Sequence, residues 1–166
     1  MQLLLLRHGI AVEPGAPGYP RDSERPLTPE GRRKTRQIAR ALAQLKLRPE
    51  VILTSPYVRA HQTAEIVAVT LRRKKQLHVC APLAGGGDPK QLIATINQQH
   101  GNAESVMLVG HEPDLSQLAS WLVTGTPGGA ALELKKGGLC LLEAETLRAG
   151  RCARLRWLVP PKVLLR

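Results

Sequence analysis

The amino-acid sequence predicts an α/β fold: a three-layer sandwich in which helices cover both faces of a mostly parallel central sheet. Short, continuous apolar runs recur along the chain, as is typical of strands buried on both faces. Segments with apolar residues at helical spacing alternate with these runs, which implies right-handed crossovers between parallel strands. A chain of 166 residues suits one core and shows no linker or internal repeat, so we expect a single domain over residues 1–166.

The amino-terminal segment predicts a strand, a loop and a helix. Gln2 to Leu6 form an uninterrupted apolar run, which suits a central strand of the sheet. Residues 13–26 are rich in proline and glycine and are expected to form a loop. Thr28 can then cap a helix with Pro29 at its first position, and apolar residues follow at helical spacing until Pro49 marks the exit.

Two further strand and helix pairs follow in the middle of the chain. Val51 to Thr54 predict a second strand, and the helix after it places small and branched apolar residues on one face. Leu77 to Cys80 predict a third strand, which is followed by the flexible segment Gly85 to Gly87. Asp88 and Pro89 then supply the cap and the first residue of the next helix.

The remaining elements complete the sheet. Val106 to Val109 predict a fourth strand that stops at Gly110 and His111. Pro113 is expected to start the helix after it, because proline is favoured at the first helical position. Residues 139–143 and 154–159 predict the last two strands.

The chain is strongly basic, with a formal net charge of +11. Such a charge suits nucleic acid, or an anionic substrate carried on an acidic protein. Only 2% of the residues are aromatic, which argues against stacking on single-stranded nucleic acid. Lys135 and Lys136 are expected on a solvated hairpin rather than at the edge of a pocket. Two further clusters are expected on solvated helical surfaces: Arg32, Arg33, Lys34, Arg36 and Arg40; and Arg72, Arg73, Lys74 and Lys75.

The three cysteines and the apolar segments indicate a cytoplasmic protein. Cys80, Cys140 and Cys152 are odd in number and widely spaced, which favours reduced thiols over a disulfide framework or a zinc site. The run after Met1 has no preceding basic residue and ends at Arg7, too soon for a secretion signal. No apolar stretch approaches the roughly 18 residues that a membrane span needs.

Polar residues with a common chemistry follow three of the predicted strands. Arg7 and His8 follow the first strand, Arg59 lies one helical turn beyond the second, and His111 follows the fourth. Ligands of open α/β sheets bind beyond the carboxyl ends of the strands, so these side chains are expected to share one rim. Guanidinium groups bind phosphate oxygens in bidentate fashion, and a neutral imidazole can attack phosphorus. The sequence therefore predicts a site for phosphoryl transfer that requires no metal and no cofactor.

Three motifs in the same order resemble those of the histidine phosphatase (phosphoglycerate mutase-like) superfamily. They are Arg7-His8-Gly9, the segment from Ser55 to Ala60 with Gln62-Thr63-Ala64, and Gly110-His111-Glu112-Pro113. The short length, with the segments Arg25 to Thr28 and Gly87 to Pro89, is most similar to the SixA-type phosphohistidine phosphatases, which lack the long helical insertions of the mutases. The resemblance covers nearly the whole chain and implies the phosphoglycerate mutase-like fold.

The resemblance also implies roles for individual residues. His8 is the expected nucleophile that becomes phosphorylated, while Arg7, Arg59 and His111 hold the phosphoryl group. Arg25, on the loop, and Gly9 are expected to contact the substrate. The partner is then a phosphorylated protein, or a small molecule that bears a phosphate.

The sequence leaves the proton donor open. Glu112 and Asp88 are the candidates, but each has an alternative role at the start of a helix. A weak acid suffices if the leaving group is the imidazole of a phosphohistidine, because that ring can be protonated near neutral pH. This favours phosphohistidine of a signalling or phosphorelay protein as the substrate. The alternatives are a small-metabolite phosphomonoesterase on the same fold and a basic nucleic-acid-binding module without catalysis.

Overall fold

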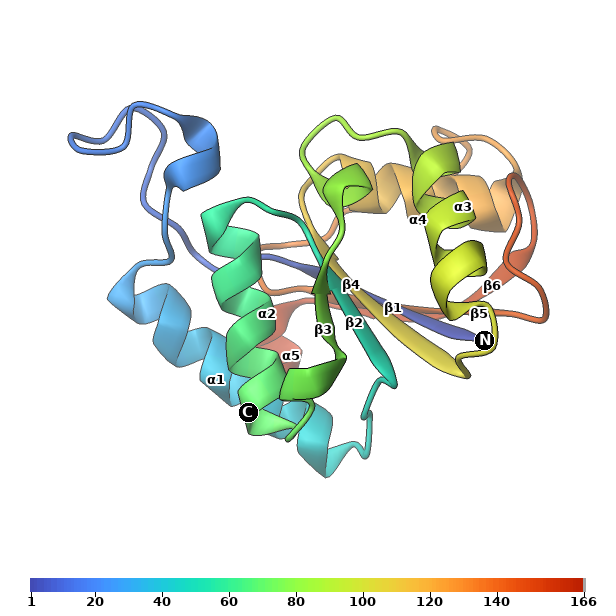
Figure 1. The fold of residues 1–166 in the computed structure, drawn as a ribbon, viewed down its shortest axis with the longest axis horizontal. Helices are drawn as coiled ribbons and strands as arrows, with labels where there is room; N and C mark the ends of the chain where they lie inside the picture. The colour runs from blue at the N-terminus through green and yellow to red at the C-terminus, as the bar shows by residue number, and fades with distance from the viewer. Residues whose placement is uncertain (166) are drawn as a thin grey trace.

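A six-stranded sheet forms the centre of the computed structural model, which describes residues 1–165 (Figure 1). The strand order is β3-β2-β4-β1-β5-β6. The first four strands in this order pair in parallel, whereas β5 is antiparallel to β1 and β6 is antiparallel to β5. The mostly parallel sheet predicted from the sequence is thus confirmed. The strands are β1 (Gln2–Arg7), β2 (Val51–Thr54), β3 (Leu77–Val79), β4 (Ser105–Gly110), β5 (Leu139–Ala144) and β6 (Ala153–Val159).

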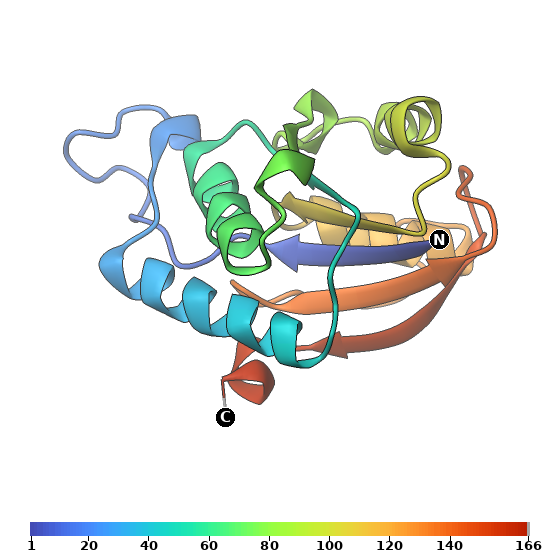
Figure 2. The same cartoon turned by 60° about the horizontal axis from the view of Figure 1, so that its bottom comes forward.

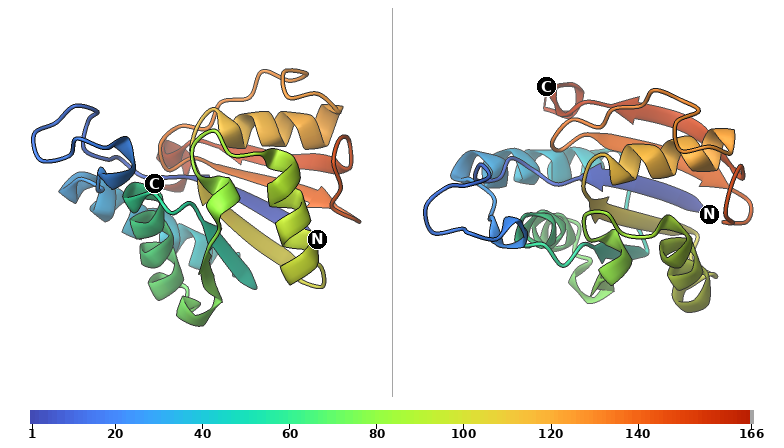
Figure 3. Two further views of the ribbon diagram at one scale, coloured as in Figure 1. Left: turned by 45° about the horizontal axis from the view of Figure 1, so that its top comes forward. Right: turned by 90° about the horizontal axis from the view of Figure 1, so that it is seen from above.

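Helices cover both faces of this sheet (Figures 2 and 3). One face packs against α1 (Pro29–Gln44) and α2 (Val58–Thr70), and the other against α3 (Pro89–His100) and α4 (Asp114–Thr124). A short helix, α5 (Pro161–Leu164), lies against α1 near the end of the chain. Three 3-10 turns complete the structure: η1 (Asp22–Glu24), η2 (Lys74–Gln76) and η3 (Ala81–Leu83).

The leucines of β1 show how one strand serves two cores. Leu3 and Leu5 belong to the cluster shared with α3 and α4, while Leu4 and Leu6 belong to the cluster shared with α1 and α2. Successive side chains of a strand point to opposite faces, so an uninterrupted apolar run is what a doubly covered strand requires. All four leucines are buried. Full burial of one such side chain stabilises the fold by roughly 1.5–3 kcal/mol.

The predicted helix caps are present in the structure. The Thr28 hydroxyl accepts a hydrogen bond from the Gly31 N–H at 3.0 Å, and the Asp88 carboxylate accepts one from the Lys90 N–H at 2.8 Å. Each cap satisfies one of the backbone donors that a helix leaves free at its amino terminus. Pro113, expected to start α4, lies one residue before it and accepts the Gln117 N–H through its carbonyl.

The expected hairpin at Lys135 and Lys136 is absent. The two lysines lie in a tight turn that precedes β5, where Gly138 N–H donates to the Lys135 carbonyl. The turn is held against the end of β1 because the Gly137 N–H donates to the carbonyls of Arg7 and His8, at 3.1 Å each. The lysines therefore lie beside Arg7.

Within residues 1–165, every helix is too short or too polar to cross a bilayer.

Candidate active site

The register of the parallel strands brings three strand ends together. Arg7 pairs with Gly110 across β1 and β4, and Thr54 pairs with Val109 across β2 and β4. Both ladders continue one step past the strands, since His8 N–H donates to the Gly110 carbonyl and Ser55 N–H donates to the Val109 carbonyl. The residues that follow these three strands therefore meet at one edge of the sheet.

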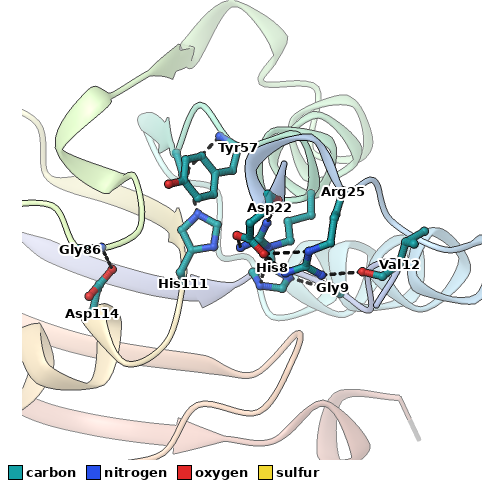
Figure 4. A network of polar contacts seen from close by, with 11 residues as sticks. His8, Gly9, Val12, Asp22, Arg25, Tyr57, Gly86, His111 and Asp114 are labelled. Atoms are coloured by element: carbon teal, nitrogen blue, oxygen red, sulfur yellow. Dashed lines mark hydrogen bonds and ion pairs between the residues drawn. The ribbon is translucent and has the colours of Figure 1, made fainter. Parts of the chain in front are cut away.

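Two imidazole rings face each other at this edge (Figure 4). The ring centroids of His8 and His111 lie 5.2 Å apart, and both side chains are buried. Arg59 reaches the same place from the first turn of α2, and its Nε lies 3.2 Å from His8 Nε2. The structure thus brings His8, His111 and Arg59 together, as the sequence predicts, and Arg7 is near enough for its charge to act on both imidazoles. Their roles in catalysis are argued below as a proposal.

The hydrogen bonds of His8 define which nitrogen is free to react. Its Nδ1 lies 2.8 Å from the Gly9 carbonyl oxygen, which can only accept, so Nδ1 carries the proton. Nε2 then holds the lone pair, toward which Arg59 Nε–H is directed. The ring is therefore a neutral imidazole with a nucleophilic Nε2.

Gly9 holds this arrangement through its backbone. Its N–H donates to the Thr63 hydroxyl of α2 at 3.0 Å, and that hydroxyl donates to the Arg59 carbonyl at 2.7 Å. A Cβ at position 9 would lie 2.6 Å from the Thr35 hydroxyl of α1, closer than real contacts allow. Only glycine lets the chain pass between the two helices. Since the Gly9 amide is engaged by Thr63, its expected contact with substrate stays a prediction.

Two buried side-chain nitrogens at the site have no partner among the described residues: Arg7 Nε and His111 Nδ1. His111 Nε2 lies 2.8 Å from the Ser55 hydroxyl, which already accepts the Tyr57 N–H. Donation of the hydroxyl proton to Nε2 leaves the ring proton on Nδ1. An unsatisfied buried donor costs about 1–3 kcal/mol, so each of these N–H groups is a candidate partner for a bound oxyanion.

The carboxylate of Asp22, which the sequence did not single out, links Arg25 and Arg59. Asp22 accepts from Arg25 Nε at 2.8 Å and from Arg59 Nη2 at 2.9 Å, while Arg25 Nη1 donates to the Val12 carbonyl (Figure 4). Partial burial alone would raise the pKa of Asp22, but the hydrogen bonds from Arg25 and Arg59 outweigh it and hold that pKa below its usual value. The only sequence signal was an acidic residue three positions before Arg25.

Both imidazoles are held neutral by their surroundings. Burial, together with the neighbouring Arg59, His111 and Arg7, lowers the pKa of His8 to about 3, although the hydrogen bond to the Gly9 carbonyl acts in the opposite direction. Burial and the charge of Arg59 likewise lower the pKa of His111 to about 4, although Asp22 acts in the opposite direction. A nucleophilic imidazole must be unprotonated, and this environment keeps the His8 ring in that state across the physiological range of pH.

The low pKa of His8 predicts a loss of stability in acid. The folded state has a pKa of about 3 where the ordinary value is 6.5, so the unfolded chain binds more protons between these two values. Stability is therefore full above pH 6.5 and falls as the pH drops toward 3. From pH 7 to pH 5, we expect His8 alone to lower the free energy of unfolding by about 2 kcal/mol. His111 acts in the same direction.

Urea unfolding of the wild type and of His8→Ala at the two pH values measures this effect. The variant should lose about 2 kcal/mol less than the wild type on acidification. If the free energy of unfolding falls by the same amount in both proteins, the pKa of His8 is not lowered by folding. That result would contradict a neutral His8 ring in the folded protein.

The two candidate proton donors both bind backbone at a helix start. The Glu112 carboxylate accepts the Ser116 N–H of α4 at 3.2 Å, and the Asp88 carboxylate caps α3. These contacts account for both acids through helix capping. A role for either one as proton donor stays a prediction.

Comparisons with known proteins agree with this geometry. Residues 3–83 match the family model of the histidine phosphatase superfamily (branch 1). The chain is 32% identical to the phosphohistidine phosphatase SixA of Escherichia coli, over 75% of this chain and 76% of that protein. It is 38% identical to an uncharacterized protein of Picosynechococcus sp., over 99% of both chains.

A solved structure of the protein histidine phosphatase SixA, complexed with tungstate, has the same fold. It superposes with a TM-score of 0.84 and 28% identity and covers 99% of both chains. The phosphoglycerate mutase-like fold implied by the sequence is thus confirmed. With the three strand-end motifs meeting at one site, the chain belongs to the histidine phosphatase superfamily.

Proposed function

We propose that the protein hydrolyses phosphohistidine in a signalling or phosphorelay protein, through a covalent phosphohistidine on His8 and without a metal or cofactor. The observation that carries the proposal is the neutral His8 ring, whose Nε2 lone pair faces the Arg59 guanidinium, with the His111 ring close by and two unpartnered nitrogens, Arg7 Nε and His111 Nδ1, at the site. A nucleophile surrounded by anion-binding donors suits attack on a phosphoryl group.

In the first step, His8 Nε2 attacks phosphorus from the side opposite the leaving group. A bond forms between Nε2 and phosphorus, and the bond from phosphorus to the leaving nitrogen breaks, its electron pair departing with the substrate imidazole. The transition state spreads negative charge over the three equatorial oxygens. Arg7 Nε–H, the Arg59 guanidinium and His111 Nδ1–H stabilise this charge, because they are fixed before the substrate arrives.

In the second step, water attacks the phosphoryl group on His8. The bond from phosphorus to Nε2 breaks, its electrons return to the ring, and the water proton leaves with inorganic phosphate or solvent. While the phosphoryl group is on Nε2, the ring is cationic, and the Gly9 carbonyl that accepts from Nδ1–H stabilises it. Both steps use the same donors, since the phosphoryl group stays in place while its partner changes.

The positions of the carboxylates support phosphohistidine over phosphate monoesters as the substrate. An alkoxide leaving group needs a strong general acid, whereas imidazole can be protonated near neutral pH before it leaves. Glu112 and Asp88 bind helix ends, and the pKa of Asp22 is held low by Arg25 and Arg59. These contacts favour roles for the three carboxyls other than that of a ready acid.

The donor set supports chemistry without a metal. Arginine and imidazole supply the positive charge around the phosphoryl position. Among residues 1–165, no group of three or more His, Cys, Asp and Glu side chains is arranged to hold a metal ion. We therefore expect EDTA to leave turnover unchanged.

The proposal also includes a single domain and a location in a reducing compartment. All helices of the described chain pack on the same sheet, which supports a single domain over residues 1–166. Cys80, Cys140 and Cys152 are free thiols, and burial raises the pKa of Cys140 to about 12. Unpaired thiols support a cytoplasmic location.

Initial rates on a phosphohistidine peptide and on a sugar monophosphate test the substrate class. Because a general acid contributes about 10²–10⁴ to such reactions, we expect kcat/KM to be at least about 100-fold higher on the phosphohistidine peptide. A higher kcat/KM on the sugar monophosphate would overturn the substrate class and favour a metabolite phosphomonoesterase. The assignment to the superfamily would stand in either case.

A further inference from the structure

A basic groove of about 530 Å³ opens beside Arg7, next to the candidate active site. Its charged side chains come from the end of β1, from α1, from the segment before β5 and from α5, four segments that are separate in the sequence. We call it the lysine groove. Its charged lining consists of Arg7, Lys34, Glu133, Lys135, Lys136 and Lys162.

The lysine groove and the nucleophile are joined by a rigid backbone connection. Gly137 N–H donates to the carbonyls of both Arg7 and His8, and Arg7 N–H donates to the Gly138 carbonyl. Arg7 Nη1 also donates to the Leu134 carbonyl at 2.8 Å. A partner bound in the groove is therefore held at a fixed position relative to His8.

The charge of the groove is mostly available to a partner. Five of its charged residues are basic and one, Glu133, is acidic. Lys34, Lys135 and Lys136 pair with Glu30, Glu133 and Glu13 at 2.7, 2.5 and 3.7 Å, but these lysine side chains are 37%, 60% and 39% exposed. Exposed pairs of this kind stabilise by only about 0–1 kcal/mol, so an incoming carboxylate can readily replace one partner.

We propose that the lysine groove binds acidic side chains of the phosphorylated protein substrate while its phosphoryl group lies at His8. This inference rests on the proposed function and specifies the partner: a protein whose phosphohistidine is flanked by aspartate or glutamate. The excess positive charge beside Arg7 supplies the complementarity. It also gives the high net charge a function at this place on the surface.

The lining favours a protein over nucleic acid. None of the residues that line the groove within the described chain is aromatic, so bases have no side chain on which to stack. Glu133 lies inside the groove, where it would repel a phosphodiester backbone but can pair with a lysine or arginine of a protein. Mixed charge of this kind matches a protein surface better than a polyanion.

Two synthetic phosphohistidine peptides, one with glutamates beside the phosphohistidine and one with glutamines, test the proposal. The wild type should have a kcat/KM about tenfold higher on the acidic peptide at low ionic strength. This preference should shrink in 0.5 M NaCl, because salt screens exposed charges. In the double variant Lys135→Glu/Lys136→Glu, the ratio of the two kcat/KM values should fall to about one or below.

The matched control is Lys74→Glu/Lys75→Glu. It changes the same charge on another adjacent pair of exposed lysines, at the amino-terminal end of β3, away from the groove. The control should keep the preference for the acidic peptide. If the wild type has the same kcat/KM on both peptides, the proposal is overturned. It is also overturned if both double variants lose the preference for the acidic peptide equally.

Binding separates this inference from the proposed function. If neither phosphohistidine peptide is hydrolysed, the substrate class is wrong, and fluorescence anisotropy with the unphosphorylated acidic peptide still tests the groove. Weaker binding to Lys135→Glu/Lys136→Glu than to the control supports the groove, and equal binding overturns it. An RNA oligonucleotide can also be tested as a competitor of the labelled acidic peptide. If the RNA displaces it at a lower concentration than unlabelled acidic peptide does, the proposal of a protein partner is overturned.

Discussion

His8→Ala should lower the turnover of an aryl phosphate and of a phosphohistidine peptide by about four orders of magnitude or more. Loss of the proposed nucleophile removes the covalent route entirely. In other enzymes, removal of the catalytic nucleophile lowers the rate by a similar factor. Alanine leaves the arginine donors in place, so the variant should still bind phosphate or tungstate. Steady-state rates and oxyanion competition measure the two properties separately.

The control for this variant is His78→Ala, which removes an exposed histidine on the edge strand β3. It should keep full activity. Phosphorus NMR of the quenched wild type should show a phosphoramidate that is absent from His8→Ala. Substantial turnover by His8→Ala, with no phosphoramidate in the wild type, would refute covalent catalysis at this residue.

Arg59→Ala should lower kcat/KM by about 10³-fold. Its guanidinium lies beside His8 Nε2, and loss of one preorganised donor commonly costs about 10²–10³ in rate. The variant also leaves Asp22 without one of its two arginine partners, so an uncompensated carboxylate remains at the site. Both effects weaken binding of a phosphoryl group, and competition by vanadate should weaken in parallel.

Arg59→Lys separates geometry from charge. Lysine keeps the positive charge but lacks the planar fork that binds two oxygens at once, so it should recover only part of the activity. Arg40→Ala, on the exposed surface of α1, is the matched control and should behave as the wild type. Full activity of Arg59→Lys would show that charge alone is sufficient, and near-normal activity of Arg59→Ala would remove Arg59 from the site.

The sheet and the position of the four central side chains could be predicted from the sequence because they depend on local patterns. A doubly covered strand leaves an uninterrupted apolar run, and the residue that follows it must lie at the edge of the sheet. Arg7 ends such a strand, His8 and His111 each follow one, and Arg59 follows a strand by one helical turn. Parallel pairing then brings them together without any further information.

The parts that the sequence did not predict depend on contacts between distant segments. Asp22 reaches Arg59 across 37 positions, and Ser55 reaches His111 across 56. The turn with Lys135 and Lys136 is closed by one internal hydrogen bond, but its position is fixed by hydrogen bonds to the end of β1. Such contacts are set by how loops lie on the finished sheet, for which no periodicity in the chain gives a signal.

The pairing of β1 with β4 makes folding and catalysis inseparable in this molecule. Because side chains alternate along a strand, a slip of one residue between these two strands would turn each buried leucine of β1 toward the opposite helical layer. The same slip would separate His8 from His111 by one strand position. Substitutions that loosen the middle of the sheet should therefore inactivate the protein as they unfold it, with no folded but misaligned form in between.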